Sequence, residues 1–172
     1  MYKVFFNQKP LILTNEIQEF SDTEPFIFIK YSSASQILKA LKSTKNNKVY
    51  LYHKNIDKLW KTFLKQFPVI EAAGGLVERT DNKLLFIFRN DKWDLPKGGV
   101  EKNELIIEAA KREVTEETGV ADLIVQNQLS ETYHIFKKGK RFRLKKPYWF
   151  RMSTNYMGQL KPQIEEGISK TE

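Results

Sequence analysis

The stretch that most constrains the fold of this chain is residues 98–120, which read GGVEKNELIIEAAKREVTEETGV. It predicts a helix that begins near Glu104 and ends at Gly119, because glycine readily takes the left-handed conformation that closes a helix. We expect residues 95–99 to form a fixed loop before the helix, and residues 70–79 to form the preceding strand. The stretch therefore predicts a strand, a loop and a helix in succession.

Three acidic residues share one face of this predicted helix. Glu113, Glu116 and Glu117 stand at positions i, i+3 and i+4, within the last turn. The helix dipole favours cations in that turn, and like charges at this spacing repel one another, so the arrangement indicates a bound cation. Mg²⁺ takes carboxylate and water oxygens as ligands. The alternative is a solvated acidic surface, partly neutralised by Arg112 one turn from Glu116.

The spacing of the whole stretch resembles the signature of the Nudix hydrolase family. The matching residues are Gly98, Glu104, Arg112, Glu113, Glu116, Glu117 and Gly119, with apolar Val114 and Val120 in their expected places. The resemblance covers residues 69–172 and is strongest over residues 95–120. It implies a fold of the α/β (α+β) class, an α/β/α sandwich around a mixed sheet.

The resemblance also implies an activity. Members of the family usually hydrolyse a diphosphate linkage in a nucleoside diphosphate joined to another group, with Mg²⁺ or Mn²⁺. By this resemblance Glu113, Glu116 and Glu117 would hold the metal, helped by the carbonyl of Gly98. Glu116 and Glu113 are the catalytic candidates, because the family varies in which glutamate takes the proton from the attacking water.

Other positions of the signature would have supporting roles. Glu104 and Arg112 would pair to hold the loop against the helix, and Gly119 would allow the turn out of it. Some members take the base from outside the signature, and Glu165 or Glu166 would be the candidate here. The alternative for these two residues is a solvated pair near a terminus.

Five further residues are candidates for substrate contact. They are Arg89, Trp93, Lys97, Tyr133 and Arg141. Arg89 and Lys97 would contact phosphates, while Trp93 would either stack on a base or pack inside the protein. The LPKGG segment and the AAGGLV segment at residues 72–77 most resemble the dinucleoside-polyphosphate and diphosphoinositol-polyphosphate branches. The lack of a proline between Val120 and Pro147 argues against the ADP-ribose branch.

Residues 1–67 predict a small α/β module in front of the catalytic domain. Strands are expected at residues 2–6, 10–14, 26–30 and 49–52, and helices after Ser33 and over residues 56–67. The role of this module is open between docking onto the second domain, dimerisation and substrate shielding. The second domain, residues 69–172, ends soon after Glu166, so we expect it to lack the last helix of the family or to be truncated.

The composition points to a polyanionic partner. With 29 Lys and Arg against 21 Asp and Glu, the chain has a formal charge of +8. Two long strands are expected at residues 123–136 and 142–153, and the turn between them is strongly basic. That hairpin is either an edge protected by charge or a contact for polyphosphate or nucleic acid. A buried strand is also expected at residues 84–88.

Composition also excludes several classes of site. The chain has no cysteine, which excludes disulfides, thiolate catalysis and cysteine-ligated zinc. No apolar run reaches the length of a membrane span and no signal-peptide pattern precedes the first strand, so a cytoplasmic protein is expected.

The leading hypothesis is a Mg²⁺-dependent hydrolase that cleaves a diphosphate linkage in a nucleoside polyphosphate or a related compound. The alternatives are a nucleic-acid-binding or regulatory module on a Nudix scaffold, and an RNA 5′-end pyrophosphohydrolase. The intact acidic set favours an enzyme, because a pure binding module has no evident use for it. A small nucleotide is the expected partner, and a homodimer is compatible with the sequence.

Overall fold

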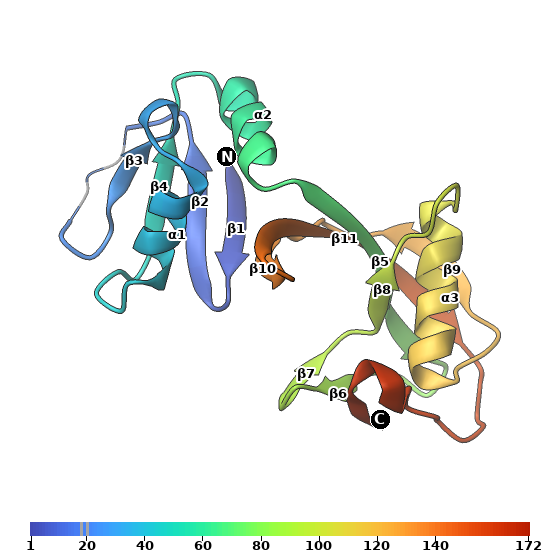
Figure 1. Cartoon of the computed structure of the whole chain (residues 1–172). Coiled ribbons are helices and arrows are strands. Elements are labelled where there is room, and N and C mark those ends of the chain that lie inside the picture. The colour runs from blue at the N-terminus through green and yellow to red at the C-terminus, as the bar shows by residue number, and fades with distance from the viewer. Residues whose placement is uncertain (18, 20) are drawn as a thin grey trace. The chain divides into compact units, whose positions relative to one another are not determined.

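The computed structural model describes residues 1–17, 19 and 21–172. These residues form two compact units, and each unit is built from two separate segments of the chain (Figure 1).

Unit 1 comprises residues 1–70 and 132–146, and unit 2 comprises residues 71–131 and 147–172. The chain first passes from unit 1 to unit 2 after Ile70, close to the domain boundary that we expected after residue 67. The segment 132–146, which the sequence-based division assigned to the second domain, belongs by its contacts to unit 1.

Unit 1 is a mixed sheet with two helices. Its elements are β1 (Tyr2–Phe6), β2 (Lys9–Thr14), β3 (Phe26–Phe28), the 3-10 helix η1 (Ile29–Tyr31), α1 (Ala34–Lys42), β4 (Val49–Tyr52), α2 (Ile56–Gln66), β10 (His134–Lys138) and the first part of β11 (Arg141–Thr154). The strand order is β3-β4-β2-β1-β10-β11, with parallel pairs β3–β4, β4–β2 and β1–β10. The hairpin β10–β11 therefore extends the sheet of the N-terminal module.

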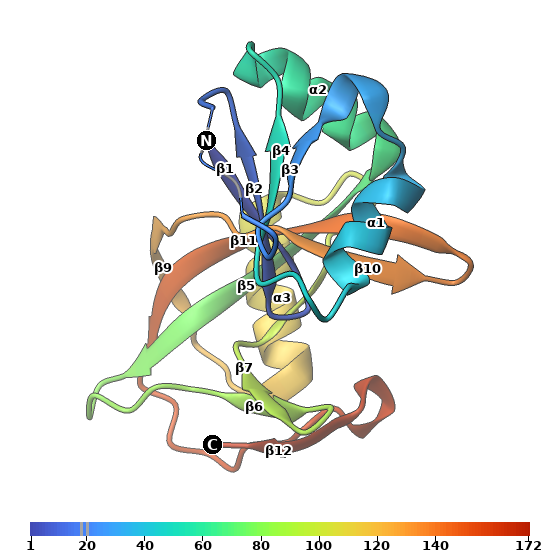
Figure 2. The same ribbon diagram turned by 90° about the vertical axis from the view of Figure 1, so that its left-hand side faces the viewer.

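The local sequence explains the elements of unit 1. The strands β1 and β4 alternate in burial, whereas the last four residues of β2 are all buried. Val4, Leu11 and Leu51 face a core that both helices cover. The capping box expected at Ser33 is present, since the Gln36 N–H donates to Ser33 Oγ and the Ser33 N–H donates to Gln36 Oε1. Figure 2 shows α1 and α2 on the same side of the strands.

Unit 2 contains a larger sheet, a long helix and a smaller three-stranded sheet. Its elements are β5 (Val69–Arg79, whose first residues belong to unit 1), β6 (Ile87–Arg89), β7 (Lys92–Asp94), β8 (Lys97–Gly99), α3 (Ile106–Thr118), β9 (Ile124–Gln128), the second part of β11, the 3-10 helix η2 (Ile164–Glu166) and β12 (Ile168–Thr171). In the larger sheet β8 pairs with β5, β5 neighbours β11, and β11 pairs with β9. The smaller sheet has the order β12-β6-β7.

The core of unit 2 lies under α3. Ala109, Ala110 and Val114 of the helix pack against Ala73 and Met152 of the sheet, which fixes the face that α3 turns away from the core. This mixed sheet with helices confirms the expected α+β class.

Three expected element boundaries were wrong. The helix begins at Ile106, so Glu104 precedes it. The expected strand at 84–88 is shifted to β6, and Leu84 is exposed, because β6 pairs with β7 and β12 in the small sheet. The expected strand at 123–136 is two strands, β9 and β10, which belong to different units.

Within the described residues, the structure contains no helix with the length and apolar character needed to span a membrane.

Candidate active site

The end of α3 sets the position of the acidic residues. Gly119 closes the helix with φ 74°, and its N–H donates to the Thr115 carbonyl at 2.8 Å. A residue with a side chain is strained in this left-handed conformation, which is why glycine suits the position. The predicted end of the helix is therefore confirmed.

A guanidinium joins the loop before α3 to the helix. Arg112 donates from Nε to Glu104 Oε1 at 2.8 Å and from Nη2 to Glu104 Oε2 at 2.9 Å. Nη2 also donates to the Gly99 carbonyl at 2.9 Å. Two-pronged pairing of this kind is strong and directional. The hydrogen bonds from Arg112, followed by the Glu101 N–H, lower the pKa of Glu104 to about 2.

The same guanidinium contacts two acids of α3. Arg112 Nη1 donates to Glu113 Oε1 at 2.8 Å and to Glu116 Oε2 at 2.9 Å. The pairing with Glu104, with help from these two acids, raises the pKa of Arg112 and keeps it charged. Arg112 thus neutralises part of the repulsion among the carboxylates.

Glu113 faces Gly98, which lies in strand β8 and not in the loop expected over residues 95–99. A Cβ added to Gly98 would lie 1.8 Å from Glu113 Oε2, so a larger residue and this carboxylate cannot occupy the space together. Gly98 lies in β8, where it pairs with Ala73 of β5. Burial raises the pKa of Glu113, while Arg112 acts in the opposite direction.

Glu117 is the most buried acid of the site, with a side chain only 1% exposed. Its Oε2 accepts the Lys97 N–H at 2.7 Å, and its Oε1 lies 3.4 Å from Arg89 Nη1. Burial raises the pKa of Glu117 to about 7, against the lowering effect of Lys97 and Arg89. Glu116, by contrast, is 47% exposed. The three acids therefore occupy three different environments.

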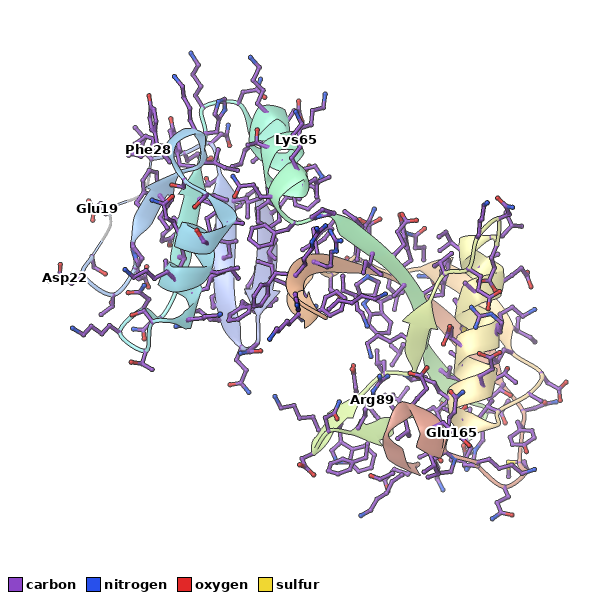
Figure 3. All side chains as sticks on the ribbon, in the orientation of Figure 1. Glu19, Asp22, Phe28, Lys65, Arg89 and Glu165 are labelled. Atoms are coloured by element: carbon purple, nitrogen blue, oxygen red, sulfur yellow. The ribbon has the colours of Figure 1, made fainter. Side chains whose placement is uncertain are left out.

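Arg89 connects Glu117 to the C-terminal segment. Its Nη2 lies 3.3 Å from Glu166 Oε2, and the charge of Glu166 contributes to the raised pKa of Glu113. Glu165, the other candidate extra acid, is exposed beside it on η2 (Figure 3 labels Arg89 and Glu165). Glu166 is thus the member of the pair that the structure brings to the acidic cluster.

The candidate substrate contacts divide between the units. Trp93 is exposed on β7 and meets Phe88 edge to face at 5.0 Å, and Lys97 Nζ lies 2.6 Å from Asp94 Oδ2. Together with Arg89, these residues belong to unit 2, as do the acids.

Tyr133 and Arg141 belong to unit 1. Tyr133 packs edge to face on Trp60 at 5.1 Å, as part of the aromatic cluster beside the unit 1 core, and Arg141 begins β11. These two residues therefore belong to a different unit from the acids.

Asp94 was not identified from the sequence, although its spacing from Lys97 is a signal for a local ion pair. The β6–β7 turn was also missed. Asn90 and Asp91 both have positive φ there, of 51° and 59°, which is the pattern of a tight hairpin turn.

The donor set fits a hard divalent cation in its chemistry. Carboxylates of α3 stand beside the backbone of Gly98, and oxygen ligands are what Mg²⁺ prefers. Among the residues that the structure describes, however, no group of three His, Asp or Glu side chains is arranged to hold a metal. The reason is visible in the contacts, since Arg112 holds Glu113 and Glu116 while Glu117 faces Lys97. Arg112 Nη1 holds one oxygen of each of the first two carboxylates, Glu113 Oε1 and Glu116 Oε2, so the second oxygen of each would be the ligand of an ion.

Comparison with known proteins gives a family and several relatives. The model of the NUDIX domain matches residues 69–172. The chain is similar to an RNA pyrophosphohydrolase of Sphingopyxis alaskensis, with 29% identity over 55% of this chain and 67% of the relative. It is also similar to an RNA pyrophosphohydrolase of Pelagibacter ubique, with 33% identity over 54% of this chain and 65% of the relative. The chain thus spans about two thirds of each curated relative.

Among solved structures, a MutT protein from Methanosarcina mazei has 22% identity and a TM-score of 0.47, covering 62% of this chain and 77% of that protein.

Proposed function

Because the chain belongs to the Nudix family, we propose that it is a pyrophosphohydrolase that needs a divalent metal ion and cleaves a diphosphate linkage in a nucleoside polyphosphate. The observation that carries the proposal is the acidic face of α3. Glu113, Glu116 and Glu117 lie on it, and Gly98 of β8 leaves room for the Glu113 carboxylate.

Hydrolysis of a diphosphate needs neutralised phosphoryl oxygens, a water in line with the bond and a base for its proton. Mg²⁺ or Mn²⁺, when bound, would supply charge neutralisation and a water of lowered pKa. Glu113, Glu116 and Glu117 would hold the ion with the Gly98 carbonyl.

Glu116 is the better placed of the two candidate bases. Its carboxylate is half exposed, so a water molecule can reach it, whereas Glu113 is largely buried against Gly98. Arg112 contacts both and would orient Glu116 when the proton is taken up.

Arg89 and Lys97 are the cations nearest the buried acid. Arg89 lies between Glu117 and Glu166, and Lys97 is fixed by Asp94. A phosphate group bound here would contact the side chains of Arg89 and Lys97, which their acidic partners hold in place. Exposed Trp93 on β7 offers a flat ring for a base.

A second candidate substrate is the 5′-polyphosphate end of an RNA. It is favoured by the names of the two curated relatives, both RNA pyrophosphohydrolases. Hydrolysis of this substrate would use the same site and cleave the same kind of diphosphate bond. The two substrates differ only in whether a single nucleoside or an RNA strand is attached to the phosphates.

The test is release of phosphate and pyrophosphate from a panel, with and without Mg²⁺ or Mn²⁺. The panel holds nucleoside triphosphates, dinucleoside polyphosphates, ADP-ribose and 5′-triphosphate RNA. We expect metal-dependent turnover of at least one compound, and a loss of about 100-fold or more in Glu116→Gln and Glu117→Gln. Glu108→Gln is the matched control, because Glu108 is exposed on the same helix outside the signature. Full activity in the Glu116→Gln/Glu117→Gln double variant would refute the proposal.

A further inference from the structure

Among the described residues of unit 1, helices cover one face of the sheet and leave the other face without a helix. Residues of β1, β2 and β4 that point to one side, such as Val4, Leu13 and Leu51, form the core with α1 and α2. Side chains alternate along a strand, so the neighbouring residues point to the opposite side. We call that side the open face (Figure 2 shows both helices on the other side).

Aromatic rings cover much of the open face. They are Phe26 and Phe28 of β3, Tyr50 and Tyr52 of β4, Phe5 of β1 and Phe136 of β10. The rings of Phe26 and Tyr52 lie 5.2 Å apart and those of Phe28 and Tyr52 lie 5.3 Å apart, so rings of adjacent strands touch. Phe28 is 49% exposed (labelled in Figure 3). The other five rings are half-buried, so each keeps part of its surface open to solvent, and a group of partly open rings outside the core is typical of an interaction surface.

Lysines stand beside these rings. Lys3 Nζ lies 5.1 Å from the centre of the Phe5 ring, Lys48 Nζ lies 5.3 Å from that of Tyr50, and Lys145 Nζ lies 5.3 Å from that of Phe136. A hollow of about 210 Å³ lies between Lys48, Tyr50, Ile12, Thr14 and Met1. The face thus carries rings, lysines and a recess, and Lys48 is also paired with Glu24 at 3.4 Å.

Charge is divided unequally between the two units. Unit 1 has 18 Lys and Arg against 5 Asp and Glu, a net charge of +13. Unit 2 has 11 against 16, a net charge of −5, and the two sum to the +8 of the whole chain. The positive charge is therefore concentrated in the unit that lacks the acidic cluster, as expected for a unit that binds a polyanion.

We propose that the open face binds single-stranded RNA, with bases stacked on its rings and phosphates at the lysines beside them. Rings accept unpaired bases, whereas a base-paired duplex hides the base faces. The alternative partner is a folded acidic protein. It would complement the positive charge of unit 1, but it would have no unpaired bases to stack on the aromatic rings. The choice of RNA over DNA rests on the second candidate substrate of the proposed function, because stacking and charge are common to both strands.

The test is fluorescence anisotropy with a labelled single-stranded RNA that ends in a 5′-hydroxyl, in buffer with EDTA. Without a polyphosphate or a metal, the acidic site of unit 2 takes no part, so this result is independent of the proposed hydrolysis. We expect salt-sensitive binding. In Phe28→Leu/Tyr52→Leu we expect it to weaken by about 25-fold or more, from roughly fivefold for each lost stacking ring.

Matched variants separate stacking from loss of fold or of bulk charge. Tyr31→Leu removes an exposed ring outside the strands, and Tyr52→Phe keeps the ring; both should bind within about twofold of the wild type. Lys3→Gln should lower the slope of log affinity against log salt concentration by the equivalent of about one phosphate contact. Lys61→Gln, which changes an exposed residue of α2, should leave that slope unchanged.

Four results would overturn the inference. They are no binding at low salt, equal affinity for duplex and single strand, tighter binding of the single-stranded DNA of the same sequence, and equal weakening by Tyr31→Leu. Self-association that is lost in Phe28→Leu/Tyr52→Leu, without RNA binding, would assign the face to a second copy of the chain instead.

Discussion

Glu117 makes the fold of unit 2 sensitive to pH in a direction opposite to most carboxylates. Its pKa rises from an ordinary value near 4.5 to about 7, mainly because the side chain is buried. Below pH 4.5 the group is protonated in both the folded and the unfolded chain, and nothing is lost. Between 4.5 and 7 the unfolded chain releases the proton while the folded chain keeps it, so stability falls as pH rises.

This shift corresponds to a loss of about 3 kcal/mol of stability in the wild type, complete above pH 7 and absent below pH 4.5. Glutamine is neutral at every pH, and its Oε1 can still accept the Lys97 N–H. We therefore expect Glu117→Gln to gain about 3 kcal/mol relative to the wild type between pH 4 and pH 9.

The assay is urea unfolding followed by tryptophan fluorescence over this pH range, in EDTA. Parallel stability profiles for the wild type and the variant would refute the reasoning, because they would mean that Glu117 is not buried as a titrating group. Repeating the series with Mg²⁺ tests the proposed function. An ion held by the ionised carboxylate should stabilise the wild type at pH 8 and leave the variant unchanged.

Three further predictions concern other parts of the chain. Gly98→Ala should lower hydrolytic activity and cost about 1–3 kcal/mol in urea unfolding, since its Cβ would overlap the Glu113 carboxylate; Gly99→Ala, where a Cβ meets nothing within 4 Å, should be near neutral, and equal effects would contradict this. Phe63→Ala should cost about 3–5 kcal/mol in urea unfolding, because the side chain is fully buried in unit 1; a cost below about 1 kcal/mol would argue against that core. The wild type should lose stability as the pH falls from 4.5 to about 2, because protonation of Glu104 breaks its ion pair with Arg112, and Glu104→Gln should lack this part of the loss. Acid unfolding followed by circular dichroism measures the difference, and identical curves for the two proteins would contradict the prediction.

The sequence determined the features that depend on short spacings. Three acids share a face of α3 because a helix places i, i+3 and i+4 together, whatever surrounds it. The stop at Gly119 and the capping box at Ser33 are likewise local, since each needs only a few neighbouring residues.

Several boundaries could not be read in this way. The stretch 123–136 was expected to be one strand, yet it divides between β9, which pairs with β11 in unit 2, and β10, which pairs with β1 in unit 1. Ser130 and Glu131 lie at the break. Strand propensity does not choose between partners, so pairing with distant segments decides which sheet each of the two strands joins.

Only the tertiary structure decided how the acids differ. Glu117 and Glu116 are adjacent in sequence, but packing under the loop buries one and leaves the other half exposed. The bridge from Arg89 to Glu117 and Glu166 joins three distant segments of unit 2, and Tyr133 lies in unit 1 with Trp60. Burial and long-range pairing arise when the whole chain excludes water from a site, and residue spacing carries no record of that.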